Sequence, residues 1–197
     1  MIRVFSVGFL NTNCYMLIGE VSNSCLILDP GGSAETISSE IIRQNLQPQA
    51  ILATHGHYDH ILGAHELQLA FEIPFYVHEA DAFLVKGMRE RAQHWMQTEV
   101  IEQPPQIDGF LTDGQQVQLG EQIWQVLASP GHTPGGICLF NQEEKVVFTG
   151  DTLFADAVGR TDLSYSSKKD LKKSLAKIKE KFAGYHAYPG HGEDFYI

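Results

Sequence analysis

The sequence has few cysteines and lacks any long apolar run. Its 197 residues include three cysteines, with no C-x-x-C pair. An odd number at wide spacing in apolar surroundings is typical of reduced, buried thiols, so we expect no disulfide framework. No segment is long and apolar enough to cross a membrane, and the first residues lack the basic and apolar regions of a signal peptide. These absences predict a cytoplasmic protein with no membrane partner.

Basic charge is also scarce. The chain has 14 Lys and Arg against 24 Asp and Glu, a formal net charge of −10. Because phosphate backbones bind basic surfaces, this balance argues against a nucleic-acid partner. Half of the basic residues lie in "KKDLKKSLAKIKEK", residues 168–181. We interpret that stretch as the solvated face of a helix rather than a docking patch.

Repeats, low-complexity tracts and Gly/Ser linkers are absent too, so we expect residues 1–197 to form a single domain. Two blocks of apolar strand-like runs are each followed by helical patterns. The order predicts an α/β fold, a four-layer αββα sandwich of two mixed β-sheets with helices on the outer faces. Expected helices cover 34–46, 59–71, 80–98 and a stretch beginning near Ser167, while 101–114 is expected to be a long loop. Ser33 is the expected N-cap of the first helix, and Ser167 with Asp170 forms a capping box at the last.

One stretch, "ILATHGHYDHILG" at residues 51–63, stands out. It follows an apolar run with His55, His57, Asp59 and His60 inside six consecutive positions. Histidines two apart in an extended loop can point the same way and share one ion, while the next Asp and His begin a helix and could reach a second. A lone histidine in a turn is usually a surface residue, but this density is typical of a metal site.

The same layout, an apolar strand, a tight turn and a ligand-type side chain, recurs at His132 in "VLASPGHTPGG", Asp151 in "VVFTGDTLF" and His191 in "AYPGHG". Such strand ends could converge on one edge of a sheet. Zinc takes imidazole nitrogen and carboxylate oxygen, and two ions roughly 3.5–4 Å apart can hold a hydroxide for hydrolysis. The remaining four histidines lack ligand-like neighbours and are not assigned to the site: His65, His78, His94 and His186.

These motifs together resemble the metallo-β-lactamase superfamily. They are T-H-x-H-x-D-H at 54–60, P-G-H-T at 130–133, T-G-D at 149–151, P-G-H-G at 189–192, and an early "ILDPGG" containing Asp29. The resemblance implies two divalent metal ions, most simply zinc, with iron or manganese as alternatives. It implies a first ion on His55, His57 and His132, and a second on Asp59, His60 and His191. Asp151 would bridge the two ions, and Asp29 would steady the histidine loop from outside.

Within the superfamily, "GDTLFADAVGRTDL" at 150–163 resembles compact glyoxalase II-like hydrolases, which are hydroxyacylglutathione hydrolases. This resemblance implies a thioesterase that acts on an S-acylglutathione or a similar small-molecule thioester through a metal-bound hydroxide, which Asp59 would orient. The sequence has no Gly-x-Ser-x-Gly nucleophile motif. It ends five residues after Gly192, where typical glyoxalase II enzymes carry a further helical region, and it has "SYSS" where relatives have Pro-Gly-Gly. These departures leave the thiol carrier open.

Two interpretations of Arg160 also remain open. It could help to hold an anionic substrate, together with basic residues at 86, 89 and 91, or it could form a buried salt bridge with Asp162 or Asp156.

Four other functions stay in view. Persulfide dioxygenases share a similar G-R-T-D segment and would use one iron on His55, His132 and Asp151. A lactonase or β-lactamase would use the same fold, although a secreted lactamase would need an export signal. A nuclease is disfavoured by the acidic, compact chain. A metal-binding module without activity is disfavoured by the complete ligand set.

Overall fold

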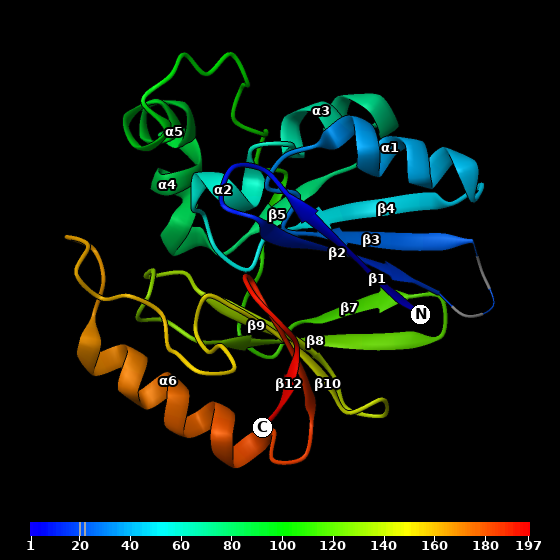
Figure 1. Ribbon diagram of the computed structural model, residues 1–197. Helices are drawn as coiled ribbons and strands as arrows, with labels where there is room; N and C mark the ends of the chain where they lie inside the picture. Colours follow the sequence, from blue (N-terminus) through cyan, green and yellow to red (C-terminus); the bar gives the residue numbers. More distant parts are fainter. Residues whose placement is uncertain (20, 22) are drawn as a thin grey trace.

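Two β-sheets lie face to face in the computed structural model, which describes residues 1–19, 21 and 23–197 (Figure 1). The first sheet runs in the order β1 (Ile2–Val7), β2 (Thr12–Ile18), β3 (Ser24–Leu28), β4 (Gln47–Leu52), β5 (Phe75–Val77) and β6 (Gly109–Phe110). The second runs β12 (Phe195–Tyr196), β11 (His186–Pro189), β10 (Val146–Gly150), β9 (Ile137–Asn141), β8 (Gln122–Ala128) and β7 (Gln116–Leu119). Both sheets mix parallel and antiparallel pairs.

Helices cover the outer faces of this pair of sheets (Figure 1). On the first sheet lie α1 (Ala34–Arg43) and α3 (Ala64–Phe71), and the last helix, α6 (Lys168–Lys181), covers the second. Further helical elements gather at one end of the first sheet: α2 (Tyr58–Ile61), η1 (Glu79–Asp81), α4 (Ala82–Lys86) and α5 (Met88–Met96). The expected four-layer αββα sandwich is therefore confirmed.

Successive side chains of the central strands point to opposite faces of their sheet, so the interior consists of three apolar layers. In β2, Met16 packs toward the helices of the first sheet, whereas Leu17 packs between the two sheets. In β10, Phe148 lies between the sheets, whereas Val147 packs against α6. Every residue of both strands is buried, as two-sided packing requires. The sheets are thus fixed from both faces, and their strand ends offer a rigid base for loops.

Two expected helices are broken into pieces. The stretch 59–71 divides into α2 and α3 at Gly63, whose N–H donates to the Pro30 carbonyl oxygen at 2.9 Å. A Cβ at Gly63 would lie 3.2 Å from the same oxygen. The stretch 80–98 divides at Gly87, where a Cβ would meet the Arg91 guanidinium. Both glycines allow a close approach that the helical pattern does not reveal.

Other boundaries also differ from the prediction. The first helix ends at Arg43 rather than residue 46, since Asn45 turns left-handed at φ 52°. Ser33 occupies the N-cap position but makes no side-chain cap, because its own backbone is left-handed at φ 51°. The expected loop 101–114 contains the short strand β6, which pairs with β5. A further strand, β12, follows the strand predicted before His191 and pairs with it as β11.

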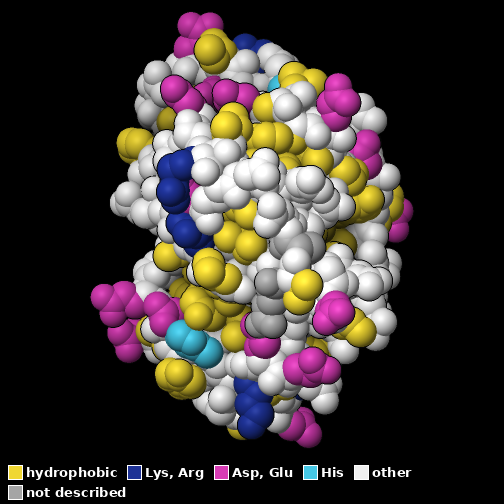
Figure 2. All heavy atoms as spheres, turned by 90° about the vertical axis from the view of Figure 1, so that its right-hand side faces the viewer, with side chains coloured by type: hydrophobic (Ala, Val, Ile, Leu, Met, Phe, Trp, Pro, Cys, Tyr) yellow, Lys and Arg dark blue, Asp and Glu magenta, His cyan; other side chains and the backbone are white. Residues whose placement is uncertain are grey.

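Some hydrophobic side chains are exposed on the surface. Figure 2 shows the face that lies on the right-hand side of Figure 1, where the N-terminus is. On this face, hydrophobic side chains are spread among polar ones. Scattered exposed apolar residues are normal for a folded protein. The three cysteines are buried and unpaired, as predicted. Among the described residues, none of the helices has the length and apolarity to span a bilayer.

Candidate metal centre

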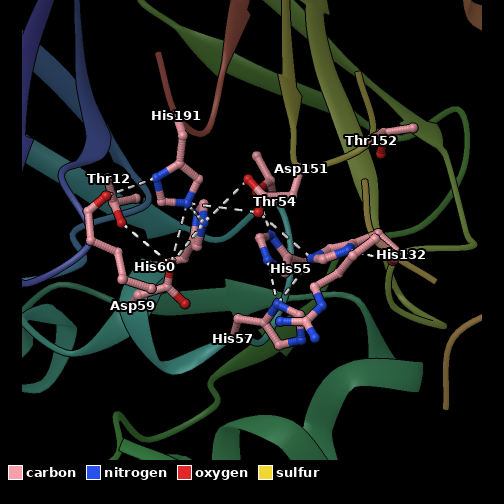
Figure 3. A network of polar contacts seen from close by, with 12 residues as sticks. Thr12, Thr54, His55, His57, Asp59, His60, His132, Asp151, Thr152 and His191 are labelled. Carbon is pink, nitrogen blue, oxygen red and sulfur yellow. Dashed lines mark hydrogen bonds and ion pairs between the residues drawn. The ribbon is translucent and has the colours of Figure 1, made fainter. Parts of the chain in front are cut away.

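The ligand-type side chains follow strands that run in one direction in each sheet. Strands β3 and β4 are parallel, and Asp29 and the histidine loop come directly after them. In the second sheet β8, β10 and β11 share one direction, and each is followed by one of the predicted ligands, His132, Asp151 and His191. Figure 3 shows these side chains pointing toward one another from the two sheets.

Three histidines form a first cluster. Nδ1 of His57 lies 3.0 Å from Nε2 of His55 and 3.0 Å from Nε2 of His132. A tetrahedral zinc ion with bonds of about 2.0–2.1 Å places its ligand atoms about 3.3 Å apart, so these separations match the edges of such a site. Neutral imidazole carries one N–H, and Nδ1 of His57 cannot satisfy both neighbours by hydrogen bonding.

A second cluster joins Asp59, His60 and His191. Oδ2 of Asp59 lies 3.5 Å from Nε2 of His60 and 3.3 Å from Nε2 of His191. The two histidine nitrogens are 3.3 Å apart. This set also has the number, type and spacing of ligand atoms that a divalent ion takes.

Asp151 lies between the two clusters (Figure 3). Its Oδ1 is 3.4 Å from Nε2 of His60, and its Oδ2 is 3.6 Å from Nε2 of His132. Oδ1 is buried and accepts no hydrogen bond from any residue that the structure describes. A buried carboxylate oxygen without a donor is costly unless a cation neutralises it, so the donor set fits two divalent ions with Asp151 between them.

The protonation behaviour of the clusters agrees with this fit. Burial, followed by the neighbouring imidazoles, lowers the pKa of His55 and lowers that of His57 to about 3. Burial acts in the same direction on His60, but the carboxylates around it outweigh burial and raise its pKa. The imidazole of His60 holds the pKa of Asp59 and Asp151 below the usual range despite burial. His55 and His57 therefore offer neutral nitrogens to a first ion, and the carboxylates around the second cluster would attract a cation.

The second ring nitrogen of each ligand histidine is held by an oxygen. Asp29 contacts Nδ1 of His60 directly at 3.0 Å, and it reaches His55 through the Thr54 hydroxyl. Nδ1 of His132 faces the Arg160 carbonyl oxygen at 3.0 Å, and Nδ1 of His191 faces that of Leu10 at 3.2 Å. Nε2 of His57 lies 2.9 Å from the Tyr165 hydroxyl. Such outer contacts fix the tautomer and orientation of metal ligands.

Asp81 is a structural residue of the site that the sequence did not reveal. Its fully buried carboxylate accepts the N–H of Gly56, between His55 and His57, at 2.9 Å. It also accepts the N–H of Gly135, just after the His132 turn, at 2.6 Å. One side chain thus ties together the two loops that build the first cluster. Burial raises its pKa, although these two N–H groups oppose the rise.

Both clusters open on one cavity of about 280 Å³. Its walls include Asp59 and Asp151 from the clusters and an apolar part formed by Phe9, Leu10, Trp95 and Leu163. Two cations, Arg91 and Arg160, lie at the same cavity. A small, partly apolar molecule with a negative charge would suit these walls.

The structure agrees only in part with each of the two interpretations of Arg160. It lies at the cavity, yet it also pairs with Asp162 at 2.7 Å. That pair is exposed, so the expectation of a buried salt bridge is wrong. The reason is that residues 160–162 run along the surface beside Trp95, over which the guanidinium lies. Lys86 and Arg89 do not line this cavity.

The four histidines set aside earlier lie outside the metal-type groups found in the described chain. His78 accepts the N–H of Ala80 at the start of η1, and His186 pairs with Asp194. His65 lies in α3 and His94 in α5.

Comparison with known proteins places these features in context. The family model described as Metallo-beta-lactamase superfamily matches residues 7–191. The chain is 35% identical over 181 residues to the hydroxyacylglutathione hydrolase GloC of Haemophilus influenzae, covering 88% of this chain and 82% of that one.

Two solved structures are similar over nearly the whole chain. The B3 metallo-beta-lactamase BLEG-1 is 31% identical with a TM-score of 0.91, covering 100% of this chain and 94% of that one. TTHA1623, solved in a di-iron-bound form, is 31% identical with a TM-score of 0.89, covering 98% and 94%.

Proposed function

The chain belongs to the metallo-beta-lactamase superfamily, and we propose that within it the protein is a thioesterase of the glyoxalase II type. Its substrate would be an S-acylglutathione or a similar small thioester. The observation that carries the proposal is the pair of ligand clusters, with Asp151 between them, that open on one cavity. The resemblance to the Haemophilus influenzae hydrolase supports the thioester as substrate.

The seven predicted ligands would hold two divalent ions, for which zinc is the simplest choice. His55, His57 and His132 would bind the first ion, Asp59, His60 and His191 would bind the second, and Asp151 would contact both. When bound, such ions lower the pKa of a coordinated water to about 7 and polarise a carbonyl group. Side chains of the protein would orient the water and bind the substrate.

Asp59 would orient the attacking water. Its carboxylate lines the cavity, and the neighbouring imidazoles keep its pKa low, so it is ionised and accepts hydrogen bonds at neutral pH. The Thr12 hydroxyl donates to Oδ2 of Asp59 at 3.4 Å, which limits rotation of the group. The thiol that leaves has a pKa near 8.5, so it departs as thiolate with little need for a general acid.

The cations at the cavity would hold the charged end of the substrate. Arg91 donates to the carbonyl oxygens of Phe83 and Leu84, and none of the ion pairs among the described residues involves its guanidinium. Arg160 is shared with Asp162 and is exposed, so its contribution would be a modest one. The apolar wall would contact the rest of the molecule.

Metal analysis combined with thiol release from S-lactoylglutathione tests the proposal. We expect about two metal ions per chain and rapid release that a chelator abolishes and zinc restores. Asp59→Asn should lose most activity. The matched control Asp156→Asn removes an exposed carboxylate outside the cavity and should keep it. Two bound ions without thiol release from any acylated thiol would contradict the proposal.

The same experiments test two rival functions. The similarity to a structure in a di-iron-bound form supports iron as an alternative to zinc. A persulfide dioxygenase with a single iron, however, would leave the second cluster without a function. One iron per chain, with oxygen uptake on glutathione persulfide, would favour it. The B3 lactamase neighbour favours lactam or lactone hydrolysis, which a β-lactam and a lactone in the same assay would detect.

A further inference from the structure

Tyr165 contacts the metal centre from outside the ligand set. It lies in the segment between β10 and α6, and its hydroxyl is 2.9 Å from Nε2 of His57, a residue 108 positions earlier. The other ligand histidines rely on backbone carbonyls or on Asp29 and Thr54, which belong to the strand ends. His57 alone depends, among the described residues, on a side chain from a distant loop.

The direction of this hydrogen bond follows from the ligand geometry. Nδ1 of His57 is the nitrogen that faces His55 and His132, so it must carry a free lone pair to bind an ion (Figure 3). A neutral imidazole then carries its hydrogen on Nε2. Nε2–H donates to the phenol oxygen of Tyr165, and this bond favours the tautomer that the metal site needs.

The position of the hydroxyl is well fixed. The Tyr165 ring packs edge-on against Phe83, with ring centroids 5.6 Å apart. The next residue, Ser166, donates its hydroxyl to the His132 carbonyl oxygen at 2.7 Å, so the same segment is attached to the other side of the first cluster. A hydroxyl held by packing on one side and by this anchor on the other loses little entropy when it binds His57.

We propose that Tyr165 is a positioning residue that orients His57 and thereby raises the affinity of the first cluster for its ion. The segment "SYSS" at residues 164–167 supplies both the hydroxyl that meets His57 and the Ser166 anchor. The inference rests on the two-ion site of the proposed function. It does not depend on a thioester being the substrate.

Zinc titration of the metal-stripped protein in competition with a chromophoric chelator tests the inference. Tyr165→Phe keeps the ring against Phe83 and removes only the hydroxyl. We expect one of the two zinc sites to weaken about tenfold or more and the other to stay unchanged, because outer partners of ligand histidines have effects of this size. Cobalt(II) substitution should show altered visible absorption at the weakened site.

Tyr58→Phe is the matched control, since Tyr58 also lines the cavity but makes no hydrogen bond to a ligand histidine within the described residues. It should bind zinc as the original protein does. Metal-stripped Tyr165→Phe should still unfold in one cooperative transition, at a Tm only slightly below the original because a single hydrogen bond is lost. This measurement separates positioning from folding. Equal zinc affinities and equal cobalt spectra for Tyr165→Phe and the original protein would overturn the inference.

The outcomes separate this inference from the proposed function. If Tyr165→Phe binds zinc normally while the original protein hydrolyses thioesters, only the positioning role fails. If Tyr165→Phe loses affinity while the original protein releases no thiol, the positioning role stands and the thioesterase fails.

Discussion

Oδ2 of Asp29 lies 3.0 Å from Nδ1 of His60, and both side chains are buried. The same carboxylate accepts the Thr54 N–H at 2.7 Å and the Thr54 hydroxyl at 2.6 Å. Since the Thr54 hydroxyl gives its hydrogen to Asp29, it can accept the Nδ1–H of His55 at 3.1 Å. One carboxylate at the end of β3 therefore sets the tautomers of a histidine in each cluster.

Asp29→Asn should weaken metal binding while keeping the fold. Asparagine tolerates the left-handed backbone of residue 29 at φ 53°. An amide is uncharged, however, and its NH₂ group would oppose one of the N–H or O–H donors that now meet the carboxylate. We expect zinc affinity, measured by chelator competition, to fall about 10- to 100-fold at the second cluster, where Asp29 contacts His60 directly, and less at the first, which it reaches through Thr54. Unchanged zinc binding in a folded variant would show that Asp29 is not a determinant of the site.

Gly190→Ala should damage the site through steric contact alone. A Cβ at this position would lie 2.2 Å from Oδ1 of Asp151 and 2.7 Å from Cε1 of His60, so the carboxylate between the clusters would have to move. We expect fewer than two bound zinc ions and loss of most hydrolytic activity. Metal analysis and circular dichroism would separate this loss from unfolding.

Gly184→Ala is the control for that variant. Gly184 has φ +80° and nothing within 4 Å of an added Cβ, so alanine there introduces backbone strain without a contact at the site. It should lower the Tm slightly and keep both ions. If the two variants lost metal equally, crowding at Asp151 would not be the cause.

The sequence predicts the succession of strands and helices along the chain and the gathering of the ligands, because both follow from local patterns. Ligand-type residues sit in short turns directly after apolar strands, and parallel strands bring such turns to one edge. The Ser167 cap of α6 is confirmed, since its hydroxyl accepts the Asp170 N–H at 3.2 Å. The expected box is only half formed, because the Asp170 carboxylate accepts the Ser167 hydroxyl at 2.8 Å, while the Ser167 N–H donates to Gly131. That cap involves four consecutive residues and needs no distant partner.

What the sequence does not predict depends on contacts between distant segments. Asp81 and Tyr165 stand in stretches without a motif, and their roles appear only when the chain brings Gly56, Gly135 and His57 to them. The breaks at Gly63 and Gly87 have the same origin. A helical pattern carries no information on the main chain or side chain that will pass beside it.

Acid should destabilise the metal-free protein partly through His57. Burial, followed by His132, lowers the pKa of His57 from 6.5 to about 3, so the folded state resists protonation while the unfolded state takes a proton near pH 6.5. The unfolded state therefore binds more protons between these values, and stability present above about pH 6.5 is lost as the pH falls toward 3. Between about pH 7 and pH 5 this group should account for on the order of 1–2 kcal/mol.

Urea unfolding of the chelator-treated protein and of His57→Gln near pH 7 and pH 5 measures this effect. Glutamine does not titrate, so the variant should lose less stability between the two pH values. His60 and His191 have raised pKa values and act in the opposite direction, but both proteins contain them. Equal losses would mean that His57 is as easily protonated in the folded state as in the unfolded state.

Substitutions of Arg160 and of Asp162 should change KM in opposite directions if the Arg160 guanidinium binds a negatively charged group of the substrate. Arg160→Met keeps the aliphatic length and removes the charge, so KM for S-lactoylglutathione should rise roughly twofold to fivefold, as expected for an exposed charge, with kcat unchanged. Asp162→Asn releases the guanidinium from its 2.7 Å partner and should lower KM.

Lys168→Met removes an exposed charge outside the cavity and should change neither constant. Added salt should raise KM for the original protein more than for Arg160→Met, because salt screens exposed charges. If KM rose in both the Arg160 and the Asp162 variants, the pair would act as a structural ion pair, and Arg91 would remain as the cation at the cavity.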